Sequence, residues 1–331
     1  MRIFLPPGED SVINRRRMIP HSAPTLGAEE ARAVARVLAG AQLADPSAFE
    51  RGLSRLLGRP TRAVQSGSAA LHVALVSLGI RRGDRVGVPA YACAAVLHAV
   101  KLAGAEPIFL DCDENGNVTD VAGRVAIVAH MFGLPAPFGG PRIVEDFAMA
   151  LGARKARGPA IGSFYATKVI TTGHGGFVAG CDVDDLLSYD NRDDYRLRFN
   201  YRMSGIAAAI GEVQLRRLPE FLRRRRRIAD RYFRELAGAR VELPPCRPEH
   251  IYYRFVVRAR EAETLVRFLR ARGIEAKRPV YRSLPSYFSK LRGKYRGAEN
   301  LWRRAVSIPI HPSLSDRDAA RVVEAVRAFP G

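Results

Sequence analysis

The chain has 331 residues, of which 47% are hydrophobic and 26% are charged. This composition supplies a sizeable core and is not that of an intrinsically disordered chain. The 53 basic residues outnumber the 33 acidic ones, so the formal net charge is +20 and anionic partners are expected. Only six of the basic residues are lysines, and an excess of 47 arginines can reflect genome base composition. Charge alone therefore does not predict nucleic-acid binding.

The cysteines and the apolar stretches bear on where the protein works. The four cysteines are Cys93, Cys112, Cys181 and Cys246. They form no CxxC pair, which indicates neither a disulfide framework nor a metal site and predicts a reducing, cytoplasmic location. The charges of residues 1–17 lie on the wrong side of a very short apolar run for a targeting peptide, and the longest apolar stretch, residues 86–100, is interrupted by Pro89 and His98. We therefore expect neither secretion nor a membrane span.

Residues 20–180 alternate helical patterns with short β-branched runs, which predicts a sheet with crossover helices. The expected helices span residues 28–39, 69–78 and 92–103. The expected strands span residues 86–88, 107–110, 125–129, 143–144, 161–165 and 176–179. Because several of these strands are continuous apolar runs, the sheet is expected to be mainly parallel and covered by helices on its faces.

The second part of the chain has a different organisation. One long helix is expected at residues 206–236, with Pro219 as the point of a kink. After it, strands are expected at 252–257 and near Ile274, and helices at 261–272, 299–305 and 316–329. The predicted fold class is therefore α/β. A large domain (1–205) is joined by the helix to a smaller α+β domain (237–331).

Three polar clusters stand at strand or helix ends in the large domain. Ser66, Gly67 and Ser68 precede a helix, where free N–H groups and the helix dipole favour a phosphate, although the same residues also make an ordinary turn with an N-cap. Asp146 ends an apolar run, where the alternative is a solvated turn or a cap. Lys168 lies among glycines and threonines between two strands, where the alternative is a solvated loop lysine.

Together the three clusters favour pyridoxal phosphate chemistry. This cofactor needs an anion site, a carboxylate that keeps its pyridine nitrogen protonated, and an amine that forms a Schiff base with its aldehyde. Lys168 follows Asp146 by 22 residues and would supply the amine. Once displaced by substrate, the same amine would act as the general base.

The chain also resembles a known family over residues 19–326. Six blocks occur in the family's order: SGSAALHVALVSLGIRRGDRVGVPAY, VAHMFGLPAP, IVEDFAMALGA, SFYATKVITTGHGGFVAG, NYRMSGIAAAIGEVQLRRL and SIPIHPSLSD. They are similar to those of the DegT/StrS sugar aminotransferases, which are fold-type-I pyridoxal phosphate enzymes. The resemblance implies an aspartate-aminotransferase-like fold. It also implies transfer of an amino group, usually from L-glutamate, to a keto group on a nucleotide-linked sugar.

The resemblance assigns roles to particular residues. It makes Lys168 the lysine that bonds the cofactor and Asp146 the partner of the pyridine nitrogen. It implies that Gly67, Ser68 and Ser163 hold the phosphate.

The resemblance also assigns roles to Asn200, at the boundary between two subunits, and to Arg202. By the resemblance, Asn200 would reach the cofactor phosphate of a neighbouring subunit, which implies a homodimer with shared active sites. Arg202 is the candidate for binding a donor or substrate carboxylate.

Several positions depart from the family's pattern. Cys93 stands where an aromatic ring commonly stacks on the cofactor; Tyr91 is the alternative stacking residue, although it suits a core position equally well. A thiol at position 93 is expected to be a buried packing residue rather than a reactive one. Met149 replaces a glutamine or histidine that helps to hold the phenolic oxygen, and a thioether cannot donate a hydrogen bond. Val169 replaces an asparagine, and His174, taken as a substrate-side residue, replaces a glutamate.

Two other functions stay open at this point. One keeps the cofactor but catalyses a dehydration or another elimination. The other is a catalytically idle, regulatory protein that binds nucleic acid through an arginine-rich surface. The run of five arginines at 223–227 would wrap around a helix, however, and is expected to be a solvated helix surface. No helix-turn-helix or zinc module accompanies it, so nucleic acid is the less favoured partner.

Overall fold

The computed structural model describes residues 18–41 and 43–331. The prediction that residues 1–17 carry no targeting peptide lies outside these residues. Within the described part of the chain, no helix is both long and apolar enough to cross a membrane.

A seven-stranded sheet occupies the first half of the chain. Its strands are β1 (Thr61–Val64), β2 (Arg85–Pro89), β3 (Glu106–Leu110), β4 (Val125–Ala129), β5 (Ile143–Asp146), β6 (Ala160–Ser163) and β7 (Gly176–Ala179). Their order is β1-β7-β6-β5-β4-β2-β3. Every neighbouring pair is parallel except those that β7 makes with β1 and β6. The predicted mainly parallel sheet is confirmed.

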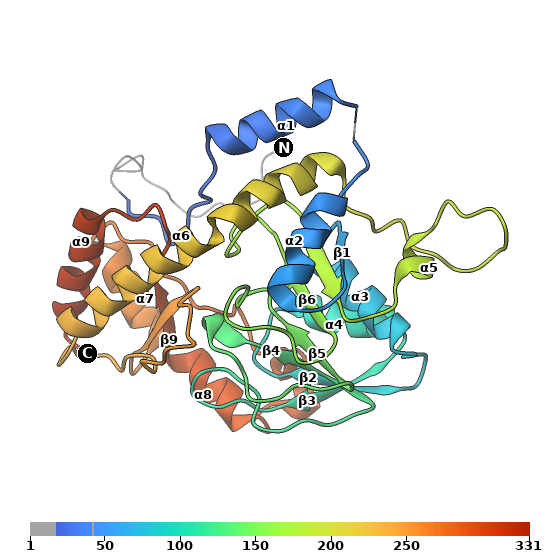
Figure 1. Cartoon of the computed structure of the whole chain (residues 1–331). Coiled ribbons are helices and arrows are strands. Elements are labelled where there is room, and N and C mark those ends of the chain that lie inside the picture. The colour runs from blue at the N-terminus through green and yellow to red at the C-terminus, as the bar shows by residue number, and fades with distance from the viewer. Residues whose placement is uncertain (1–17, 42) are drawn as a thin grey trace, which may run out of the picture.

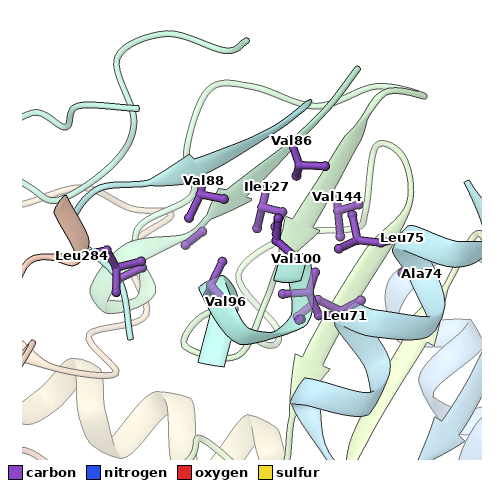
Figure 2. Close-up of a cluster of buried hydrophobic side chains, with 14 of the residues drawn as sticks. Leu71, Ala74, Leu75, Val86, Val88, Val96, Val100, Ile127, Val144 and Leu284 are labelled. Atoms are coloured by element: carbon purple, nitrogen blue, oxygen red, sulfur yellow. The ribbon is translucent and has the colours of Figure 1, made fainter. Parts of the chain in front are cut away.

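Helices cover both faces of this sheet (Figure 1). The helices of the first half are α1 (Ala28–Ala39), α2 (Ser47–Leu57), α3 (Gly67–Ser77), α4 (Ala94–Leu102) and α5 (Asp184–Leu187). On one face, side chains of α3 and α4 such as Leu71, Leu75 and Val100 pack against Ile127 and Val144 of the strands (Figure 2). The other face packs against α2 and α6 (Gly205–Glu235). Strand residues alternate between the two cores, which is the expected pattern for a sheet covered on both faces.

The second half of the chain forms a smaller helix and sheet unit beside the C-terminal end of α6 (Figure 1). It contains β8 (Phe255–Arg258), α7 (Ala262–Arg270), α8 (Arg296–Arg304), β9 (Ala305–Ile308) and α9 (Asp316–Arg327), and β8 pairs antiparallel with β9. The expected strand at 252–257 begins only at Phe255, because Tyr252 has a φ of 49°, outside the extended region. Ile274 makes an isolated bridge to Ile19 instead of a strand. The division of the chain into domains stays a prediction.

Four α-helices and strands were missed in the sequence: α2, the four-residue helix α5, β1 and β9. Helix α2 buries Phe49, Leu53 and Leu57 at a spacing of four residues, but its eleven residues include two arginines and a glycine. Strand β1, with the sequence TRAV, includes a threonine and an arginine and does not form a continuous apolar run. Strand β9 follows α8 without a turn between them. Its backbone changes from helical to extended at Ala305, where burial against β8 outweighs helix propensity.

Helix α6 joins the two halves, and its arginine run corrects one expectation. Arg223 and Arg227 are exposed as expected, but Arg225 is buried. Its Nη1 donates to the carbonyl oxygens of Tyr253 (2.9 Å) and Ile310 (2.8 Å). Because successive residues of a helix point in different directions, the run places one guanidinium in the interior, and the prediction of a uniformly solvated surface was wrong.

Candidate active site

A cavity of about 390 Å³ opens where strands β4, β5 and β6 end and helix α3 begins. The carboxyl ends of parallel strands are the usual ligand site of an open α/β sheet, and this volume is in the range of small-molecule sites. Nine of the residues predicted from the sequence line it: Ser66, Gly67, Ser68, Cys93, Asp146, Met149, Ser163, Lys168 and His174. The fold thus brings the three polar clusters into one cavity.

The first turn of α3 forms an anion cradle. Ser66 is the N-cap, and its Oγ accepts a hydrogen bond from the N–H of Ala69 at 3.0 Å. The amides of Gly67 and Ser68 precede the first intrahelical hydrogen bond and are therefore free to bind a ligand. A Cβ at position 67 would lie 2.8 Å from the Cβ of Ser163, so only glycine lets the helix start approach β6 this closely.

Asp146 is the last residue of strand β5. In the sheet register it lies beside Ala129 of β4 and Ile161 of β6. Its Oδ1 accepts a hydrogen bond from the N–H of Ala148 at 2.8 Å. Burial raises the pKa of this carboxyl. The hydrogen bond from Ala148 and the charge of Lys168 lower the pKa, but they offset only part of the rise. A cationic partner inside the cavity would favour the carboxylate form.

Lys168 belongs to an ordered loop rather than a solvated one. Its backbone N–H donates to the carbonyl oxygen of Tyr165 at 2.9 Å, and the side chain is half-buried. The Thr171 and Thr172 hydroxyls donate to the carbonyl oxygens of Phe164 (3.2 Å) and His174 (2.6 Å). These bonds within the loop explain why threonines follow the lysine, and they hold its amine toward the cavity that Asp146 also lines.

The sequence places His130 near the cleft as a hydrogen-bonded structural histidine, but it does not predict the buried pair that His130 forms with Glu145 beneath the cavity. His130 lines the cavity directly after β4, and its Nδ1 accepts the N–H of Ala136 at 3.0 Å. The proton of the neutral ring is therefore assigned to Nε2, which lies 3.3 Å from the Glu145 carboxylate. Burial lowers the pKa of His130 although Glu145 opposes this, so the ring is neutral. The contact with Glu145 follows from the parallel pairing of β4 with β5, which the local sequence does not show.

Glu145 has four hydrogen-bond or ion-pair partners. It accepts the N–H groups of Arg157 (2.5 Å) and Gly158 (3.1 Å), contacts His130 and pairs with the Arg154 guanidinium. Burial raises its pKa, but the His130 hydrogen bond, the Arg157 amide and the Arg154 charge outweigh burial, and the net direction is downward. The ionised form is therefore favoured by folding.

We expect Glu145→Ala to lower the free energy of unfolding by about 3 kcal/mol, because it leaves buried donors without an acceptor. Glu145→Gln keeps one acceptor oxygen and should cost less. Folding lowers the pKa of Glu145. The carboxylate therefore stabilises the folded state at pH values above its ordinary pKa of about 4.3, and this stabilisation is lost as the pH falls through the lower pKa of the folded state. Urea unfolding of both variants across this range tests the effect; equal stability of the wild type and Glu145→Ala would contradict it.

The candidate stacking residues occupy different places. Tyr91 does not line the cavity: its side chain is fully buried, its ring lies edge-on to Phe132 with centroids 6.3 Å apart, and burial raises the pKa of its hydroxyl. This placement is that of a core aromatic. Cys93, expected to be buried, is instead exposed and lines the cavity at the N-terminus of α4. Tyr165, which the sequence reasoning did not single out, also lines the cavity, with its ring 5.2 Å from that of His174.

Asn200 and Arg202 lie outside this cavity. Asn200 is exposed, and Arg202 lines a separate cavity of about 460 Å³ together with Glu50, Arg62 and Asp184. Their assigned roles toward a neighbouring subunit and a carboxylate stay predictions. All four cysteines are free, and the described residues contain no group of three or more His, Cys, Asp or Glu that could hold a metal ion.

The residues present fit pyridoxal phosphate. The anion cradle, a half-buried carboxyl that forms no ion pair with the described residues and an amine line one cavity of suitable volume. The model of the DegT/DnrJ/EryC1/StrS aminotransferase family matches residues 24–327. The chain belongs to this family. It is therefore a pyridoxal-phosphate-dependent aminotransferase.

Related proteins support the assignment to this family. GDP-perosamine synthase from Escherichia coli O157:H7 is 31% identical over 313 residues, covering 80% of this chain and 84% of the relative. GDP-perosamine synthase from Caulobacter vibrioides is 31% identical over 327 residues, covering 84% and 88%. Among solved structures, aminotransferase TlmJ from Streptoalloteichus hindustanus superposes with a TM-score of 0.84 at 29% identity, covering 94% of this chain and 98% of that one. The predicted family and fold class are confirmed.

Proposed function

We propose that the protein transfers an amino group from an amino acid, with L-glutamate as the expected donor, to a keto group on a nucleotide-linked sugar. The observation that carries the proposal is the meeting of Lys168, Asp146 and the start of α3 in one cavity of a chain from this aminotransferase family. Its similarity to two GDP-perosamine synthases supports a nucleotide-linked sugar as the substrate class. The net charge of +20 suits a substrate that carries a diphosphate.

Each residue has a definite task in this proposal. Pyridoxal phosphate, when bound, supplies an electron-withdrawing ring that stabilises negative charge on the reacting carbon. The amides of Gly67 and Ser68 would hold its phosphate, and Asp146 would keep its ring nitrogen protonated. Lys168 Nζ would attach the cofactor and then carry the proton between carbon atoms as general base.

The homodimer is part of the proposal. A loop between α5 and α6 protrudes from the described part of the chain (Figure 1). It carries Tyr195 and Leu197, which are 99% and 73% exposed, and leads to the exposed Asn200. Large apolar side chains on a protruding loop are the kind of surface that a second subunit covers. A cytoplasmic location, which the free cysteines favour, also belongs to the proposal.

The donor half-reaction provides the experiment. The purified protein is mixed with pyridoxal phosphate, and its visible absorbance band is followed before and after L-glutamate, with D-glutamate as the control. We expect L-glutamate, but not D-glutamate, to bleach the band and to yield one equivalent of 2-oxoglutarate per site. A band that no L-amino acid alters would contradict transamination and favour the elimination reaction. Equal binding of the keto sugar with and without its nucleotide would contradict the proposed substrate class.

A further inference from the structure

Another, much smaller cavity adjoins the loop that carries Lys168. It is lined by His21, Thr167, Arg225, Tyr253, Arg254 and Ser307, among others. Its free volume, about 10 Å³, accommodates the centre of a single water-sized particle. The Tyr253 hydroxyl donates to the Thr167 carbonyl oxygen at 3.0 Å, and the Lys168 Nζ lies 5.9 Å from the centroid of the Tyr253 ring. The cavity is therefore separated from the active site by one side chain.

Two guanidinium groups meet at this cavity without a carboxylate partner. Arg225 is only 4% exposed, and it donates to carbonyl oxygens alone. The Arg254 Nη1 donates to the Nε2 of His21 at 3.0 Å. The Nε atoms of both arginines are buried and have no hydrogen-bond partner, and neither group forms an ion pair within the described chain. One buried positive charge, on Arg225, and one partly buried charge, on Arg254, are thus left without an anionic partner among the described residues, which is costly.

The neighbouring groups do not supply the missing negative charge. Burial, with Arg254 and Lys277 as further causes, lowers the pKa of His21 to about 2, so this ring is neutral. The Glu275 carboxylate accepts the backbone N–H of His21 at 2.9 Å, but its ion pair, at 2.8 Å, is with Lys277. Burial alone raises the pKa of Tyr253, yet the charges of Arg254, Lys168 and Arg225 outweigh it and lower the pKa. The surroundings of the cavity are strongly positive.

We propose that this cavity binds one small monovalent inorganic anion of the size of chloride, between Arg225 and Arg254. Its volume suits one such ion and excludes phosphate and any amino acid or sugar substrate. The two unpartnered Nε–H groups are the available donors. Because Arg225 lies on α6, Arg254 directly before β8 and Thr167 beside Lys168, the ion would tie these three segments together.

Bromide replaces chloride in such a site and scatters anomalously, which makes the ion visible. Crystals of the cofactor-loaded protein are grown or soaked in sodium bromide, and data are collected at the bromine edge. We expect one anomalous peak within about 3.5 Å of the Arg225 and Arg254 guanidinium nitrogens. Arg254→Met should lose this peak, and Arg223→Met, on the exposed side of the same helix, should keep it. A water molecule without anomalous signal in the wild type would overturn the proposal.

Thermal unfolding gives an independent measurement in solution. At equal ionic strength, sodium chloride should raise the melting temperature of the wild type by about 2 °C or more over sodium gluconate, whose anion is too large for the cavity, and the rise should saturate. Arg254→Met should show no difference between the two salts. An equal response to both salts in the wild type would contradict the proposal even if Arg254→Met fails to fold. The visible absorbance band, recorded on the same samples, reports cofactor binding independently of the anion. A protein that binds the cofactor but shows no chloride effect would contradict the anion site and leave the proposed function standing.

Discussion

Replacing Lys168 with alanine is expected to lower aminotransferase turnover by about 10³-fold or more. Lys168 is the one lysine among the residues that line the active-site cavity, so no other described lysine is in place to attach the cofactor and move the proton. The steady-state rate with donor and acceptor measures the effect. In the wild type, borohydride reduction followed by peptide mass spectrometry should place the cofactor on Lys168, and in the variant no lysine should carry it.

The control for this variant is Lys290→Ala. Lys290 is exposed and lies outside the cavity, and its removal also takes away one positive charge. We expect its turnover to stay within a factor of two of the wild type. If Lys168→Ala kept most of the activity, or if the cofactor were found on another lysine, the assigned role would be wrong.

Replacing Asp146 with asparagine is expected to lower turnover by roughly 100-fold or more. The amide has nearly the same shape and can still accept the hydrogen bond from the Ala148 N–H, so the fold should be preserved. It carries no charge, however, and cannot favour protonation of the cofactor's ring nitrogen. The weaker electron withdrawal should appear as a lower rate of the L-glutamate half-reaction in stopped-flow absorbance measurements, with the covalent attachment at Lys168 retained.

Asp120→Asn is the matched control. Asp120 is exposed, and its carboxylate contacts only the N–H of Val121 among the described residues. The same amide substitution there should leave the half-reaction unchanged. A similar loss in both variants would point to a general effect of negative charge, and no loss in Asp146→Asn would reject its role at the ring nitrogen.

Much of the site was predictable because its residues stand at the ends of short, strongly patterned segments. Ser66 directly precedes a helix, Asp146 ends a buried strand and Lys168 follows another, so each backbone position could be inferred from local pattern. The carboxyl ends of parallel strands lie at one edge of a sheet, which brings such residues together. The comparison with aminotransferase relatives tests the family and fold, and the individual roles stay predictions.

Other features depend on partners that are distant in the sequence. His130 and Glu145 are 15 residues apart and meet only because β4 and β5 pair in parallel. Nothing in the sequence distinguishes Arg225 from the four other arginines of the run, yet it is the one that is buried. Its guanidinium donates to the carbonyl oxygens of Tyr253 and Ile310, which come from distant segments. Cys93 was expected to be buried, but the cavity leaves it exposed. No local pattern contains this information.

The sequence by itself determined the class of fold and the family, and it predicted the residues that carry the chemistry, because strand length, glycine positions and motif order are local properties of the chain. Only the tertiary structure decided which side chains share the active-site cavity, which arginine is buried and where two guanidinium groups lie without a carboxylate. Burial and charge compensation are properties of packed neighbours, and those neighbours come from segments that can lie 286 residues apart, as for His21 and Ser307.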